Sequence, residues 1–128
     1  MNPQLQAFLL AKSGERFAYG TSDCGLLIAD WWLWRHGIDP AADLRGTYET
    51  EQGCADLMRT RGGLLRIVRR IASSVGAKRV SDAHAGCFGV VRFNGAHYGA
   101  IATSETNWAI RGKGLVITRL CRPVAIWE

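Results

Sequence analysis

Cys24 is the residue of this sequence with the clearest chemical potential. It follows the polar turn 21–23 and opens an apolar, helix-length stretch that runs to Trp34. A helix N-terminus offers unpaired N–H groups and a positive dipole end, which lower the pKa of a thiol and can hold an oxyanion. Asp23 fits as the N-cap. Its negative charge opposes the lowering of the Cys24 pKa unless the carboxylate points away from the sulfur. Gly25 leaves room for a substrate carbonyl to approach. A buried structural cysteine is the alternative.

A nucleophilic cysteine needs a general base, and the chain has 3 histidines. His36 ends the helix that Cys24 begins, about 18 Å away along its axis, and cannot reach the thiol. His84 lies in a polar turn, where we expect it to be exposed. His97 opens a β-rich segment, and a rigid strand can present it to a helix end. A polar residue at the end of a hairpin is the alternative for His97.

Two segments of the chain resemble the NlpC-like, papain-like cysteine peptidases. Their nucleophile segment, an aromatic-Gly turn leading to Asp-Cys-Ser-Gly at a helix start, resembles residues 17–32 (FAYGTSDCGLLIADWW). Their histidine strand, typically His-Val-Gly-Ile, resembles residues 96–103 (AHYGAIAT). The segment 37–63 is similar to a small branch encoded beside tail genes in phages and prophages. The resemblance spans roughly residues 17–120 and implies a papain-like fold with Cys24 as nucleophile and His97 as base.

The sequence departs from the family pattern in three places. Gly25 replaces the serine after the nucleophile, and the family's Gly-Asp before the histidine becomes Gly86-Cys87, where Cys87 is expected to be a core thiol. The third polar residue, which orients the base, falls near Ala109. Asn107 shares that strand face by alternation, as does Arg111, and its amide oxygen can accept from an imidazole N–H. We therefore predict Asn107 as the third catalytic residue.

The resemblance implies a phage tail-associated cysteine hydrolase that cleaves amide bonds in peptidoglycan stem peptides during cell-wall penetration. His97 would take the Cys24 proton, and N–H groups at the helix start, with Tyr19 nearby, would stabilise the oxyanion. The phage branch often keeps the cysteine without a full set of partners. A catalytically inactive structural component of the tail tip or of tail assembly, with the same fold, is therefore the alternative.

The implied partners are other tail proteins, at the tip or hub, and the stem peptide as substrate. We expect the protein in the virion, made in the host cytoplasm without a signal peptide, since the N-terminus lacks a basic region and a clean small-residue cleavage site. The longest apolar run is interrupted by Asp30 and is too short to span a membrane. No cofactor is expected.

The cysteine spacing and the distribution of charge indicate which metal sites, redox motifs and partners the sequence favours or argues against. The 4 cysteines form no CxxC pair, which argues against a zinc or redox motif and favours reduced thiols. The net charge is +5, and the segment Arg59–Arg79 contains several Lys and Arg residues but no Asp or Glu. This basic segment indicates either an anionic partner or a solvated helix face. No nucleic-acid-binding signature accompanies it, so we expect no specific nucleic acid partner.

The expected elements form one domain, residues 1–128, with helices first and strands after them. Helices are predicted at about 3–13, 24–36, 50–61 and 64–75, with a short helix or turn at 39–40, and strands at 87–93, 97–103, 115–120 and 124–128. Asn94-Gly95 predicts a hairpin. This order predicts an α+β fold with N-terminal helices packed on a C-terminal antiparallel sheet.

Three tryptophans lie at different angles around one predicted helix: Trp31, Trp32 and Trp34. We expect Trp31 in the core and at least one of the three against a partner or a substrate groove.

Overall fold

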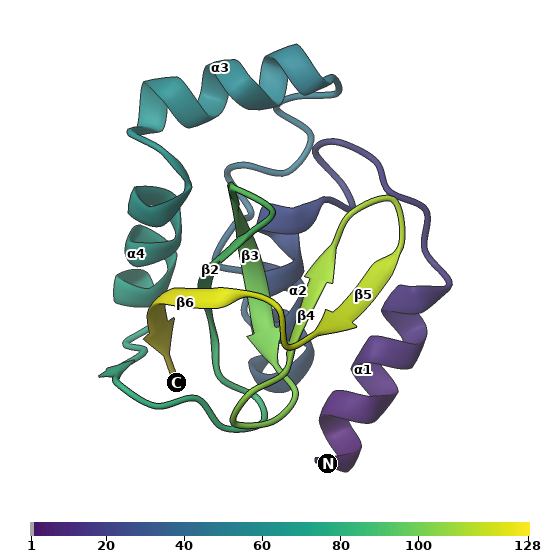
Figure 1. Cartoon of the computed structure of the whole chain (residues 1–128). Helices are drawn as coiled ribbons and strands as arrows, with labels where there is room; N and C mark the ends of the chain where they lie inside the picture. Colours follow the sequence, from purple (N-terminus) through teal and green to yellow (C-terminus); the bar gives the residue numbers. More distant parts are fainter. Residues whose placement is uncertain (1) are drawn as a thin grey trace.

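Four helices precede a six-stranded antiparallel sheet in the computed structural model, which describes residues 2–128 (Figure 1). The helices are α1 (Pro3–Ser13), α2 (Cys24–His36), α3 (Glu51–Arg61) and α4 (Leu64–Ser74). The strands are β1 (Arg79–Val80), β2 (Phe88–Phe93), β3 (Ala96–Ala102), β4 (Trp108–Arg111), β5 (Leu115–Thr118) and β6 (Arg122–Trp127). They are ordered β1-β6-β2-β3-β4-β5 in the sheet. The predicted α+β class is confirmed.

Helix boundaries follow the capping residues of the sequence. The Asn2 side chain accepts hydrogen bonds from backbone N–H groups of the first turn of α1, and Pro3 stands at the first helical position. The Thr50 hydroxyl caps α3 by accepting from the Gly53 N–H. Gly37 ends α2 in the left-handed conformation, which glycine adopts without steric cost. The segment after α2 forms turns rather than a helix.

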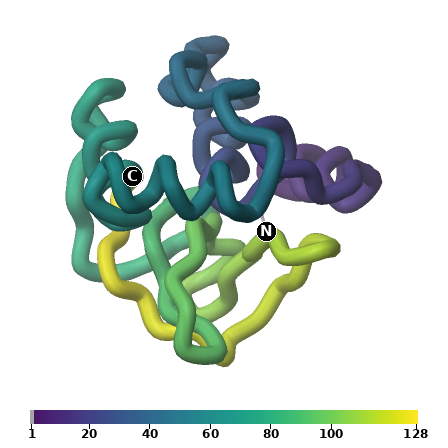
Figure 2. The backbone as a smooth tube through the Cα atoms, turned by 90° about the horizontal axis from the view of Figure 1, so that it is seen from above, coloured from purple at the N-terminus to yellow at the C-terminus, as the bar shows by residue number. Residues whose placement is uncertain are grey.

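Helices α1, α2 and α4 cover one face of the sheet. α2 contacts β3 and β4, α4 contacts β2 and β3, and α1 contacts β5. In Figure 2 these three helices lie on one side of the molecule and the strands on the other, with α3 nearest the viewer. The interface between α2 and the sheet is closed by buried side chains from both, among them Leu27, Trp31, Ile101 and Ala109. This packing fixes the start of α2 against β3.

The opposite face of the sheet carries its own apolar cluster. Cys87, Val91, Trp108 and Ile126 are buried in it. Cys87 is therefore the core thiol that the sequence predicts. All four cysteines of the chain are free thiols.

Two buried charged residues tie the helical layer together. The Arg111 side chain of β4 is buried and donates to the backbone carbonyls of Lys12, at 2.6 Å, and Glu15, which satisfies acceptors at the end of α1. Asp30, the charge that interrupts the apolar run of α2, forms ion pairs with Lys12 at 2.8 Å and Arg45 at 2.7 Å. The packing of α1 on α2 and β4 is thus partly polar.

The tryptophans of α2 divide between core and surface, and the prediction that Trp31 lies in the core is confirmed. Trp31 is fully buried, whereas Trp34 is 46% exposed. Within residues 2–128, no helix combines the length and the apolar character needed to cross a bilayer.

Candidate functional site

Asp23 holds the first turn of α2 in place. It is 3% exposed, and its Oδ1 accepts from the Leu26 N–H at 3.0 Å, which confirms the predicted N-cap. Its Oδ2 accepts from the Gly20 N–H at 3.0 Å and from the Tyr48 hydroxyl at 2.5 Å. The carboxylate therefore joins the preceding turn, the helix start and a residue 25 positions further on. Its orientation fixes the position of Cys24.

Gly99 of β3 packs directly against the start of α2. Its backbone N–H lies near enough to the Cys24 thiol to act on the pKa of that thiol. A Cβ added at Gly99 would lie 2.7 Å from the Cys24 carbonyl oxygen and 3.0 Å from Cδ1 of Ile28. A glycine is therefore required for strand and helix to approach this closely.

Replacement of Gly99 by alanine is expected to lower the free energy of unfolding by about 1–3 kcal/mol, because backbone atoms of α2 would have to move. Gly114→Ala is the matched control, since open space surrounds a Cβ there. Its stability should stay within about 0.5 kcal/mol of the wild type. Urea unfolding of both variants measures the difference, and equal stabilities would contradict the close approach.

His97 lies on the same strand as Gly99 and on the same face. The two residues are separated by one position, and alternate side chains of a strand point to the same side. The ladder with β2 pairs His97 with Arg92 and Gly99 with Val90. His97 is exposed, and no hydrogen bond within residues 2–128 joins its ring to Cys24. The strand thus presents His97 on the side of the sheet where Cys24 lies.

Asn107 does not lie beside His97, and its prediction as the third catalytic residue is wrong. The ladder between β3 and β4 pairs Ala102 with Trp108, so Asn107 belongs to the turn at the end of β3. Its carbonyl oxygen accepts from the Thr103 N–H at 2.9 Å, closing that turn. His97 lies near the start of β3, about 17 Å away along the strand. The length of the turn between β3 and β4 sets the register of the two strands. It places the Asn107 amide at the end of β3 that is remote from His97.

The other positions considered for the third residue cannot orient the base either. Ala109 is fully buried opposite Ile101 and carries no polar group. The Arg111 guanidinium is used by the carbonyls at the end of α1. Neither position provides a partner for His97.

The surroundings of Cys24 favour the protonated thiol. Burial, and then the negative charge of Asp23, raise the pKa of Cys24 to about 11. Hydrogen bonds from the N–H groups of Gly99 and of Cys24 itself act in the opposite direction but are outweighed. The helix start therefore acts in the predicted direction, but burial and the Asp23 charge outweigh it, and the net pKa of Cys24 is raised. A reaction at neutral pH requires a base to remove the thiol proton.

Three further groups surround Cys24 and Asp23. Burial and the charge of Glu51 raise the pKa of Tyr19. Burial and the hydrogen bond to Asp23 raise the pKa of Tyr48, and burial and the charge of Asp23 raise the pKa of Cys54. Tyr48 and Cys54 were not among the predicted site residues, since their contribution depends on how the segment after α2 folds back. The site therefore offers neutral hydroxyl and thiol groups at neutral pH.

Alkaline pH is expected to destabilise the protein through Cys24. Its folded-state pKa is raised above the ordinary value of 9.0, so the contribution of the protonated thiol is complete below about pH 9 and is lost as pH rises through about 11. The loss is on the order of 2 kcal/mol. Urea unfolding at pH 8 and pH 11 should show a smaller decrease in Cys24→Ala than in the wild type. Equal decreases would contradict the raised pKa.

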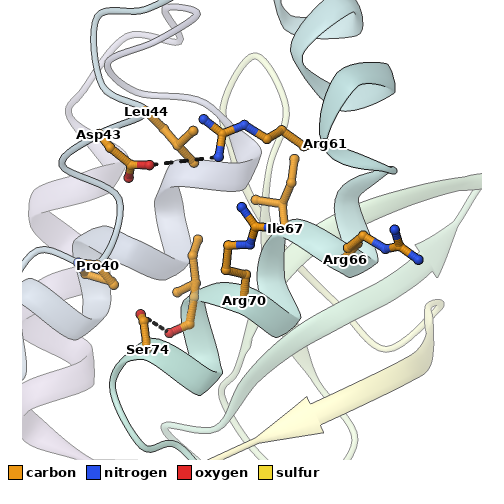
Figure 3. A pocket seen from close by; sticks show the side chains of 9 residues that line it. Pro40, Asp43, Leu44, Arg61, Arg66, Ile67, Arg70 and Ser74 are labelled. Atoms are coloured by element: carbon orange, nitrogen blue, oxygen red, sulfur yellow. Dashed lines mark hydrogen bonds and ion pairs between the residues drawn. The ribbon is translucent and has the colours of Figure 1, made fainter.

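A pocket lies between α4, the end of α3 and the turn after α2 (Figure 3). The pocket has a volume of about 160 Å³ and contains Arg61, Arg66 and Arg70 together with apolar residues such as Ile67. Arg61 reaches across toward Asp43, with 3.9 Å between nitrogen and oxygen. Neither Cys24 nor His97 lines this pocket. Part of the basic segment Arg59–Arg79 therefore lines a defined pocket.

The fold and the site define an α+β protein in which a capped helix presents one cysteine against a glycine of an antiparallel strand. The chain belongs to the family DUF6950, described as a domain of unknown function, which it matches over residues 1–128. Neither a curated protein nor a solved structure matches the chain.

Proposed function

We propose that the protein is a phage tail-associated, NlpC-like cysteine hydrolase that cleaves amide bonds in peptidoglycan stem peptides during cell-wall penetration. The supporting observation is the position of Cys24, at the capped start of α2 and packed against Gly99 of β3, with His97 on the same face of that strand. The papain-like assignment of the fold and the stem peptide as substrate come from the sequence resemblance. Other tail proteins would be its partners in the virion.

The chemistry begins from a neutral thiol. Because the pKa of Cys24 is about 11, His97 acts as a general base that removes the proton as sulfur attacks the amide carbonyl. The Gly25 N–H, in the first turn of α2, has no acceptor within residues 2–128 and is available to the developing oxyanion, with the Tyr19 hydroxyl nearby. Protonated His97 then gives its proton to the leaving amine, and water hydrolyses the thioester.

A structural tail-tip or tail-assembly component without turnover is the second candidate. Ala109 at the position of the third catalytic residue and the raised pKa of Cys24 favour it. Apolar side chains at the surface do so too, since Leu10 is 76% exposed and Leu120 78% exposed. Surfaces of this kind are typical of proteins that assemble with others.

Digestion of purified murein separates the two candidates. A hydrolase releases soluble stem-peptide fragments, and Cys24→Ser releases none. A structural component gives no fragments from either protein, even when both are tested after assembly with their tail partners.

A further inference from the structure

Three potential metal ligands converge at the end of α2 that is remote from Cys24. His84, Cys87 and Glu128 each offer one ligand atom, and these atoms lie within 4.8 Å of one another. The neighbouring Gly86 accepts a hydrogen bond from the Trp31 indole at 2.9 Å, which anchors this cluster beside the second half of α2. Neither the proposed hydrolysis nor any residue of the Cys24 site uses these groups.

We propose that His84, Cys87 and Glu128 bind one divalent transition metal ion, with Zn²⁺ as the preferred species. A thiolate, an imidazole and a carboxylate are the three side-chain ligand types that Zn²⁺ accepts. Soft sulfur combined with nitrogen makes Mg²⁺ and Ca²⁺ poor alternatives, because those ions select oxygen ligands. Water would complete a tetrahedral site.

The separations between the ligand atoms are close to those of a tetrahedral zinc site. Nε2 of His84 lies 3.4 Å from Sγ of Cys87 and 3.2 Å from Oε2 of Glu128. Ligands at about 2.0–2.3 Å from zinc are about 3.3–3.7 Å from one another in a tetrahedron. The third separation, between Cys87 and Glu128, is at most 4.8 Å. Sγ of Cys87 is also 3.3 Å from Nδ1 of His84, so rotation of the His84 ring and of the Glu128 side chain is needed to direct all three ligand atoms at one ion.

The backbone holds all three residues in place without a metal. The Cys87 N–H donates to the His84 carbonyl at 3.0 Å and closes a four-residue turn. Gly86 has a positive φ of 97°, as the third position of a type II turn requires. Glu128 is held by reciprocal backbone hydrogen bonds with Lys78, at 2.9 and 3.0 Å. The ordering cost that weakens a flexible site is therefore small here.

Burial and charge are compatible with a bound cation. Cys87 is 1% exposed, whereas the side chains of His84 and Glu128 are 57% and 46% exposed, so the ion can enter from the solvent side. Binding replaces the thiol proton by the metal, and the thiolate and carboxylate then neutralise a divalent ion. Burial raises the pKa of the Cys87 thiol and the nearby Arg35 charge offsets this only in part, so the metal ion has to displace the thiol proton. The bound ion would link the turn at 84–87 to Glu128, which follows the last strand, β6.

Titration of the metal-free full chain with Co²⁺, followed by competition with Zn²⁺, tests this site. We expect one equivalent of Co²⁺ to give a near-ultraviolet thiolate-to-metal charge-transfer band, which Zn²⁺ abolishes. His84→Gln and Glu128→Gln should each weaken Zn²⁺ binding by at least about 10-fold, since loss of a group that only orients a ligand already costs that much. His84 and Glu128 have exposed side chains, so their variants should fold. They therefore test metal binding even where Cys87→Ser fails to fold. Zn²⁺ should also raise the Tm of the wild type but not of His84→Gln.

Matched controls distinguish this site from other thiols and histidines of the chain. Cys121→Ser removes another buried thiol, and His97→Gln removes an exposed histidine near the start of β3. Both should bind Zn²⁺ as the wild type does. The absence of the charge-transfer band, or its loss in Cys24→Ser with retention in Cys87→Ser, would overturn the proposal. None of these readouts depends on hydrolytic activity.

Discussion

Murein hydrolysis is expected to fall by at least about 10⁴-fold when Cys24 is replaced by serine. The serine hydroxyl is far less acidic than the thiol, and the site has no third residue to strengthen His97 as a base. The negative charge of Asp23 beside the nucleophile makes an alkoxide still less favourable. Release of soluble stem-peptide fragments from purified murein, measured by mass spectrometry, gives the rate.

Cys54→Ser is the matched control for this experiment. Cys54 is the other thiol whose charge acts on Cys24, but it belongs to α3 and not to the start of α2, which supplies the proposed oxyanion position at Gly25. Its replacement should leave the rate within about threefold of the wild type. Full activity in Cys24→Ser, or loss of activity only in Cys54→Ser, would show that the nucleophile is wrongly assigned.

Two further substitutions test the base. His97→Gln should lower the rate by about 10²–10⁴-fold, since proton transfer by a positioned side chain contributes that much. Asn107→Ala should leave the rate unchanged, because Asn107 lies in the turn at the far end of β3. An effect of Asn107→Ala as large as that of His97→Gln would contradict the observed register.

Local sequence signals predicted the positions of the helices well. Asp23, Asn2 and Thr50 each cap a helix that begins at the next residue, because their side chains satisfy N–H groups of the first turn. The β-rich composition of residues 97–103 likewise predicted the strand that carries His97 and Gly99. These features depend on residues no more than a few positions apart.

Features that depend on distant pairing were predicted less well. Asn107 was placed by counting along the chain, but the register of β3 and β4 is set by the turn between them. Tyr48 reaches Asp23 only because the segment after α2 folds back over the helix start. The absence of a CxxC pair argued against zinc, yet His84 and Cys87 have the same spacing, and pairing of β2 with β6 brings Glu128 to them.

The pKa of Cys24 shows how two opposing effects were weighed wrongly. The sequence places the thiol at a helix start, which lowers a thiol pKa, and next to Asp23, which raises it. How far the thiol is buried cannot be read from its neighbours in the chain. Burial by β3 is the largest cause of the raised pKa, and the Asp23 charge is the next.

Asp23→Ala is expected to lower the free energy of unfolding by about 3–4 kcal/mol while making Cys24 more reactive. The substitution removes the helix cap and leaves the N–H groups of Gly20 and Leu26 and the Tyr48 hydroxyl without their acceptor. Loss of a cap and of buried hydrogen-bond partners is among the most destabilising kinds of change. The same change removes a negative charge that raises the pKa of Cys24, so the thiolate fraction at pH 8 increases. Urea unfolding and the rate of alkylation by iodoacetamide measure the two effects.

Tyr48→Phe separates the two effects of Asp23. It removes one hydrogen bond to the carboxylate but keeps both the cap and the charge. We expect a loss of about 1 kcal/mol with little change in alkylation. Alkylation has to be measured well below the unfolding midpoint of each variant, so that exposure of the thiol by unfolding does not contribute. If Asp23→Ala then reacted no faster than Tyr48→Phe, burial alone would account for the raised pKa, and the acidic cap would have no part in controlling the thiol.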